Sequence, residues 1–134
     1  MADKLLFSLV SPAKELFSGE VDHVIAPGTD GEFGVLPNHA PFMSTLKNGV
    51  VRVINAGEED RRVFVRGGFA DITPEGFTIL AEEATDLGDV DAAGVRESLQ
   101  TAREDLAKLS SDDPKRGAAA EHVVYLEALS DALN

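Results

Sequence analysis

The sequence predicts an all-β domain over residues 1–87, followed by a C-terminal α-helical hairpin over residues 88–134. Up to Leu87, short runs of apolar and β-branched residues are separated by Gly, Pro and Asn turn signals. This pattern is typical of an antiparallel sandwich or barrel. After Gly88 the apolar residues recur at intervals of three and four, the period of an α-helix. With 134 residues, the chain is long enough to bury a full core.

Composition restricts the classes of function. The formal net charge is −12, which repels nucleic acid and anionic lipid. No apolar run approaches the ~20 residues of a membrane helix, and we interpret Met1 to Phe7 as the start of a strand, not a targeting peptide. The absence of cysteine excludes disulfides, thiolate metal sites and a thiol nucleophile. We therefore expect a soluble cytoplasmic protein that does not bind nucleic acid or insert into a membrane.

The first two strands come before a heavily punctuated loop. One strand begins near Leu5 and ends at Ser11-Pro12, and an extended stretch runs from Glu15 to Ala26. Ser18-Gly19 interrupts this stretch and predicts a bend or bulge there.

The loop from Ala26 to Pro41 contains three glycines and three prolines. Asp30-Gly31 predicts a tight turn with positive φ, and each proline restricts its own φ and the residue before it. Such control holds Glu32 and His39 in set positions, so we expect this loop to present a surface. The glycines match neither the Walker A pattern nor the dinucleotide fingerprint, and no helix begins after them to bind a phosphate.

The later strands are bounded by clear turn signals. Gly67-Gly68 allows a bulge or a close backbone approach, and Thr73-Pro74-Glu75-Gly76 fits a four-residue turn. The last clear strand is 77–81. The expected strands of this part of the chain are 32–36, 42–46, 50–54, 62–66, 69–73 and 77–81.

Two amphipathic helices end the chain. Asp89 or Asp91 can cap the first helix; Asp113 is expected to cap the second, with Pro114 at its first position. Joined by a short turn, the helices form an antiparallel hairpin. Their apolar stripes can cover each other, or a remainder can contact the sandwich or another protein. The stripes are Val95, Leu99, Ala102, Leu106 and Leu109, then Ala119, Val123, Leu126, Leu129 and Leu133.

Five motifs, by their order and spacing, carry a family resemblance. They are Leu16-Phe17-Ser18-Gly19, then Gly28 to Pro41, then Leu46-x-x-Gly49, Gly67-Gly68-Phe69-Ala70 and Ile79-Leu80-Ala81-Glu82. Together with the trailing hairpin, they resemble the epsilon subunit of bacterial F-type ATP synthases over nearly the whole chain.

The resemblance implies a sandwich of ten strands and two helices. Such a protein is a non-catalytic rotor subunit of the central stalk, without cofactors, in a complex at the cytoplasmic face of the bacterial inner membrane. Residues 1–87 would hold the gamma subunit to the c ring during proton-driven ATP synthesis. The resemblance also allows the hairpin to contact the beta or alpha subunits.

The resemblance also implies a c-ring interface at Gly31, Glu32, Phe33 and His39. A carboxylate on a rigid loop can accept charge-assisted hydrogen bonds from basic loops, and we favour this role for Glu32 over that of a solvated turn residue. For His39, bracing its own loop is an equally good interpretation.

Other activities lack support in the sequence. His23, His39 and Asp30 do not have the short spacing of metal ligands, and no Gly-x-Ser-x-Gly elbow indicates a hydrolase. Some relatives in the resembled family bind ATP through an Ile/Leu-Asp-x-x-Arg-Ala motif. Here Asp91 is retained but Gly94 takes the arginine position, and a phosphate site needs the guanidinium. We therefore expect no nucleotide site.

The charge of the second helix bears on regulation. In self-inhibiting relatives, basic side chains of this helix meet an acidic segment of the beta subunit. In this chain no basic residue follows Arg116, whereas Glu121, Glu127 and Asp131 are acidic. Like charges across an interface are unfavourable, so we expect weak or absent inhibition of ATP hydrolysis by the hairpin.

Overall fold

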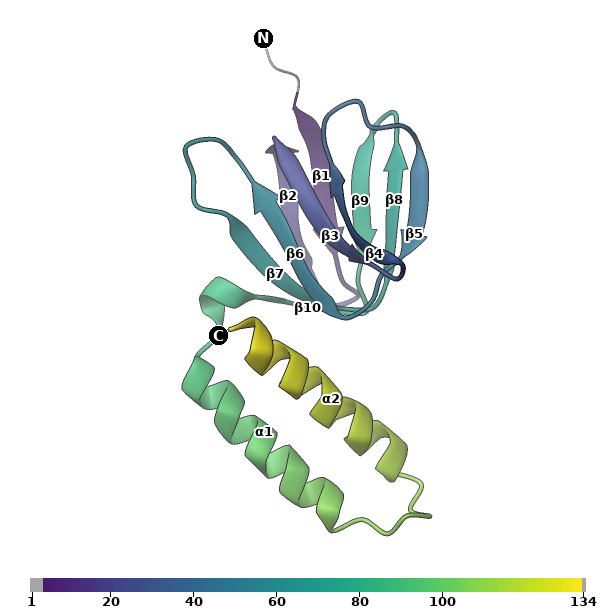
Figure 1. Ribbon diagram of the computed structural model, residues 1–134, viewed down its shortest axis with the longest axis vertical. Coiled ribbons are helices and arrows are strands. Elements are labelled where there is room, and N and C mark those ends of the chain that lie inside the picture. The colour runs from purple at the N-terminus through teal and green to yellow at the C-terminus, as the bar shows by residue number, and fades with distance from the viewer. Residues whose placement is uncertain (1–3, 134) are drawn as a thin grey trace. The chain divides into compact units, whose positions relative to one another are not determined.

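The computed structural model describes residues 4–133 and contains two five-stranded β-sheets followed by two α-helices (Figure 1). The predicted fold class is confirmed, and of the two architectures that the strand pattern allowed it is a sandwich. The chain falls into two compact units that divide between Asp89 and Val90. The strands are β1 (Leu5–Val10), β2 (Glu15–Val21), β3 (His23–Gly28), β4 (Gly31–Val35), β5 (Phe42–Thr45), β6 (Gly49–Ile54), β7 (Arg61–Arg66), β8 (Phe69–Thr73), β9 (Gly76–Leu80) and β10 (Glu83–Asp86), before a 3-10 turn at Leu87–Asp89.

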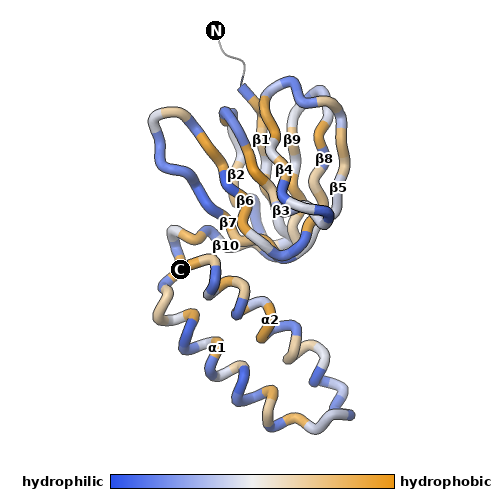
Figure 2. The backbone as a smooth tube through the Cα atoms, viewed as in Figure 1, coloured by the Kyte–Doolittle hydropathy of each residue, from blue (hydrophilic) through white to orange (hydrophobic). Residues whose placement is uncertain are grey.

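The two sheets enclose one hydrophobic core. Sheet A has the strand order β2-β1-β9-β8-β5, and sheet B has the order β10-β7-β6-β3-β4. Every strand pair is antiparallel except β1 with β9. Hydrophobic and hydrophilic residues alternate along the strands (Figure 2), which gives each sheet one apolar face. Side chains at the centre of the core include Phe7, Leu9, Phe77, Ile79, Val24, Val51 and Val63.

The bend expected at Ser18-Gly19 lies instead at Asp22. Both Ser18 and Gly19 pair regularly with β1; the register shifts two residues earlier, at Leu16, and the strand ends at Val21, before Asp22 and the start of β3 at His23. At that point the chain crosses from sheet A to sheet B. The Asp22 N–H donates to the Ile54 carbonyl, and its carboxylate accepts from the Ala56 N–H at 2.7 Å and from the Lys4 ammonium at 2.6 Å. The hydrogen bonds of Asp22 therefore satisfy the polar groups at this crossing. The prediction from Ser18-Gly19 did not locate it, because a glycine is not needed there.

The strand at 77–81 is not the last one, because β10 follows it. β10 has four residues and pairs with β7. Ion pairs support the pairing: Arg66 contacts Glu83 at 3.2 Å, and Arg61 contacts Asp86 at 2.7 Å. A strand this short and polar has no apolar alternation, so the sequence pattern could not separate it from a loop.

The second unit is a hairpin of α1 (Ala92–Ala107) and α2 (Arg116–Ala132), which lie side by side (Figure 1). Asp91 is the cap of α1; its carboxylate accepts from the Ala93 N–H at 3.2 Å. α2 begins two residues later than Pro114. The Asp113 carboxylate accepts from the Lys115 N–H, and the Arg116 N–H donates to the Asp113 carbonyl. These bonds close a tight turn before the regular helical bonds start.

Among residues 4–133, neither helix combines the length and apolarity of a helix that crosses a membrane.

Candidate docking surfaces of the sandwich

The Ala26–Pro41 segment forms a two-residue hairpin turn between β3 and β4. Gly28 pairs with Gly31 across Thr29-Asp30, and Gly31 has φ +133°, as the sequence predicted. A Cβ at Gly28 would lie 2.7 Å from the Gly31 carbonyl oxygen and 2.9 Å from the Phe33 ring, which is closer than real side chains approach. These glycines are therefore required by the tight turn itself.

Glu32 and Phe33 follow the turn and point in opposite directions. Glu32 is exposed and lies opposite Pro27. Phe33 is half-buried and packs edge-on against Phe42, with ring centroids 5.5 Å apart. The Phe33 ring therefore closes the edge of the core behind the turn and leaves Glu32 as the side chain presented to solvent.

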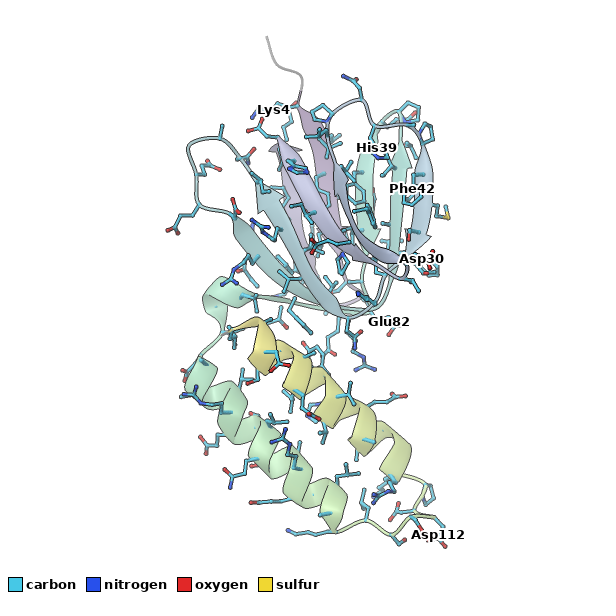
Figure 3. The ribbon with its side chains drawn as sticks, in the orientation of Figure 1. Lys4, Asp30, His39, Phe42, Glu82 and Asp112 are labelled. Carbon is cyan, nitrogen blue, oxygen red and sulfur yellow. The ribbon has the colours of Figure 1, made fainter. Side chains whose placement is uncertain are left out.

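His39 does not lie with Gly31 and Glu32. β4 is extended, at ~3.3 Å per residue, and places the loop at residues 36–41 at the opposite end of the strand from the turn (Figure 1). Figure 3 shows Asp30 near one end of the sandwich and His39 toward the other, where Lys4 also lies. The His39 N–H donates to the Leu36 carbonyl, and the ring Nδ1 lies 2.7 Å from the Ala40 carbonyl oxygen.

The contacts of His39 are those of a residue that braces its own loop. Asn38 in that loop has φ +66°, a conformation that Asn tolerates better than most residues. A groove of about 380 Å³ beside the loop is lined in part by Lys4, His39 and Glu75. This groove is separate from the turn that carries Glu32.

A second surface, not recognised in the sequence, lies on the outer face of sheet A. Val10, Leu80 and Phe69 are adjacent in register across β1, β9 and β8, and we call these three residues the apolar row. Leu80 and Phe69 are each 55% exposed. Met43, 68% exposed, lies on β5 diagonally from Phe69. The available signal was the two neighbouring apolar residues in Ile79-Leu80, because a strand with one solvated face should alternate.

The structure adds no support for the metal and nucleotide sites that were considered from the sequence. Within residues 4–133 no three His, Asp or Glu side chains come together as metal ligands, and the His23 ring lies against Gly34, where a Cβ would meet its Nε2 at 2.8 Å. The Asp91 carboxylate caps α1, and a Cβ at Gly94 would lie 3.4 Å from it.

The family model for the beta-sandwich domain of the ATP synthase delta/epsilon chain matches residues 4–86. The chain belongs to this family. It is 60% identical over 133 residues to the ATP synthase epsilon chain of Hyphomonas neptunium, covering 99% of this chain and 98% of that protein. It is 50% identical over 129 residues to the epsilon chain of Maricaulis maris, covering 96% of each.

Solved structures agree with this assignment. A chain in a structure of the OSCP, F1 and c-ring parts of the Euglena gracilis mitochondrial ATP synthase aligns with a TM-score of 0.78 and 25% identity, over 98% of this chain and 82% of that chain. A chain of the Tetrahymena thermophila enzyme aligns with a TM-score of 0.64 over 99% and 98%, and at 13% identity it shows the fold alone. The family resemblance seen in the sequence is confirmed: the chain is a non-catalytic rotor-stalk subunit of an ATP synthase.

Proposed function

We propose that the sandwich couples the gamma subunit to the c ring through two different surfaces. The hairpin turn that ends in Gly31 and Glu32 contacts the c ring, and the apolar row on sheet A contacts gamma. The observation that carries this proposal is the exposure of both surfaces on one compact unit. A subunit that binds each partner at its own surface can transmit rotation between them without any chemistry of its own.

The chemistry of the turn suits a polar, basic partner. Glu32 is exposed on a strand, which limits its backbone freedom, and the Phe33 ring is packed on Phe42 behind it. A carboxylate held in this way can accept charge-assisted hydrogen bonds from lysine or arginine side chains. In this proposal Gly31 and Glu32 touch the ring, Phe33 supports them from inside, and His39 braces the opposite loop.

The apolar row suits a partner that also offers apolar surface. Burying a large apolar side chain fully is worth ~1.5–3 kcal/mol, and Leu80 and Phe69 are each about half exposed. Neighbouring Met43 extends the surface and can adapt to an irregular partner. Association through this face should therefore depend little on salt, whereas the contact of Glu32 should weaken as salt is added.

We propose that this assembly lies at the cytoplasmic face of a bacterial inner membrane, where the chain is peripheral; its membership of the epsilon-chain family supports this location. The hairpin is the part that could reach the beta or alpha subunits. Its regulatory effect is expected to be weak, because Glu121, Glu127 and Asp131 carry negative charge on α2. We propose no nucleotide site, since the Asp91 carboxylate is occupied as a helix cap.

Binding measurements on the full chain test the two surfaces separately. Glu32→Gln should weaken binding to purified c ring and leave binding to gamma unchanged. Phe69→Ser should do the reverse. The proposal fails if either variant weakens binding to gamma and to the c ring equally. It also fails if neither variant weakens binding to either partner.

A further inference from the structure

We infer that Thr29 and Thr45 are positioning residues that join the turn carrying Glu32 to the sheet carrying the apolar row. This inference rests on the proposed function, because it concerns how the two surfaces are kept in a fixed relation. It assigns a role to two exposed threonines that neither the sequence motifs nor the core packing explain.

Three short contacts connect the two residues. The Thr29 N–H donates to the Thr45 carbonyl at 3.1 Å, and the Thr29 hydroxyl donates to the same carbonyl at 3.0 Å. The two hydroxyl oxygens lie 2.6 Å apart. Since the Thr29 hydroxyl proton goes to the carbonyl, the remaining bond is donated by the Thr45 hydroxyl to the Thr29 oxygen. All donors are then used once.

The turn needs this support because the pairing of β3 with its neighbour in sheet B, β6, ends before the turn begins. The pairing of β3 with β6 ends at Ile25, opposite Arg52, and two residues later Pro27 has no N–H to donate. Beyond that point, among residues 4–133, the backbone of the hairpin is bonded to itself, to Thr45 at the end of β5 and to the two residues that follow Thr45. Gly28 forms a bridge with Leu46, and the Lys47 N–H donates to the Pro27 carbonyl at 3.0 Å.

The contact links the turn that carries Glu32 to the strand that pairs with the apolar row. Thr29 stands three residues before Glu32, within the turn. Thr45 ends β5 and is paired directly with Phe69 of the apolar row. A displacement of the turn relative to sheet A therefore strains the Thr29–Thr45 bonds together with the Gly28–Leu46 bridge. The threonines add a side-chain link to the backbone contacts that hold Glu32 in place relative to Phe69.

Valine is close to threonine in shape, so Thr29→Val and Thr45→Val remove hydroxyls with little change in volume. The backbone bond from residue 29 remains in both variants. We expect the turn to stay formed but to hold Glu32 less firmly. Thr45→Val, which removes one hydroxyl hydrogen bond, should lose roughly threefold in affinity for the c ring, and Thr29→Val, which removes two, roughly tenfold. Both variants should bind gamma as the wild type does.

The experiment measures binding of the full chain to purified c ring and to purified gamma. Thr78→Val is the matched control: it lies on the outer face of sheet A, and among residues 4–133 its hydroxyl makes no hydrogen bond. Thr29→Ser keeps the hydroxyl and should restore binding to the ring. The double variant Thr29→Val/Thr45→Val should bind the ring as Thr29→Val does, because Thr29→Val already removes both hydroxyl hydrogen bonds.

Two results would overturn the inference while leaving the proposed function intact. One is a Thr29→Val protein that binds the ring like the wild type although Glu32→Gln weakens that binding. The other is an equal loss of gamma and ring binding in Thr29→Val, which indicates general damage to the domain. If Glu32→Gln itself binds the ring normally, the proposed ring contact is wrong and this inference falls with it.

Discussion

The guanidinium of Arg116 lies 2.8 Å from the backbone carbonyl oxygen of Leu109, to which its Nη1 donates a hydrogen bond. The same nitrogen also donates to the Leu106 carbonyl at 3.2 Å. The first residue of α2 thus adds a donor at the end of α1, where helix carbonyls run out of intrahelical partners. The Leu106 carbonyl also accepts from the Leu109 N–H. A cation at this position also interacts favourably with the helix dipole.

Replacing Arg116 with Gln should therefore destabilise the hairpin. The loss of charge-assisted hydrogen bonds to the carbonyls is expected to cost ~1–2 kcal/mol. Hydrogen exchange of the α1 and α2 amides measures this locally, and protection should fall while that of the sandwich strands is unchanged. The control is Lys115→Gln, an exposed neighbour. Equal protection in Arg116→Gln and the control would show that the contact contributes nothing.

Acid should weaken the sandwich through Asp22. The hydrogen bond from the Ala56 N–H, followed by the bond from Lys4, lowers the pKa of the Asp22 carboxyl below its ordinary value of 3.8. Because the pKa of Asp22 is lower in the folded state than in the unfolded state, its ionised carboxylate stabilises the fold at any pH above the unfolded-state pKa. This stability is lost as the pH falls through the folded-state pKa. As the pH is lowered past about 4, the free energy of unfolding of the wild type should fall, and that of Asp22→Asn should fall less steeply. Parallel pH profiles for the two proteins would rule this out.

Gly68 should tolerate no side chain. Its φ is +114°, and a Cβ would lie 2.1 Å from the Leu80 carbonyl oxygen. Gly68→Ala combines backbone strain of ~1–2 kcal/mol with overpacking of ~1–3 kcal/mol. Gly57 is the matched control, because it also has positive φ, +82°, but open space around its Cβ position. Denaturant unfolding should show a much larger loss for Gly68→Ala, and similar losses would contradict this explanation.

Removing the hairpin should not release a strong inhibition. Deletion of residues 89–134 leaves the ten strands intact, and the acidic side chains of α2 are poorly suited to an acidic segment of the beta subunit. The measurement is ATP hydrolysis by the assembled complex with the truncated or the full chain. We expect similar rates, and a large rise on truncation would disprove the prediction.

Local signals predicted most of the fold. The Thr73–Gly76 turn and the cap at Asp91 lie where the sequence placed them, because turn and cap preferences act within a few residues. Asp22 and β10 were missed for the opposite reason. Their stability comes from partners far along the chain, such as Ala56 for Asp22 and Arg66 for Glu83.

The candidate site was predictable only in part. The spacing of glycines and prolines predicted the tight turn at Gly31, whereas the assignment of Gly31, Glu32 and His39 to one ring interface came from the family resemblance and stays a prediction. An extended strand separates residues by its length, so His39 lies at the other end of β4. The apolar row is assembled from β1, β9 and β8, and no single segment contains its pattern.

The coupling of ATP hydrolysis to proton transport tests the central claim most directly. Reconstituted ATP synthase is assembled with wild-type chain or with Glu32→Lys, which reverses the charge at the proposed ring contact, and both ATP hydrolysis and proton pumping are measured. Glu58→Lys, a charge reversal at an exposed side chain in the loop between β6 and β7, serves as the control. Our account predicts that Glu32→Lys keeps hydrolysis but loses much of the pumping per ATP. An unchanged ratio of pumping to hydrolysis in Glu32→Lys would contradict it.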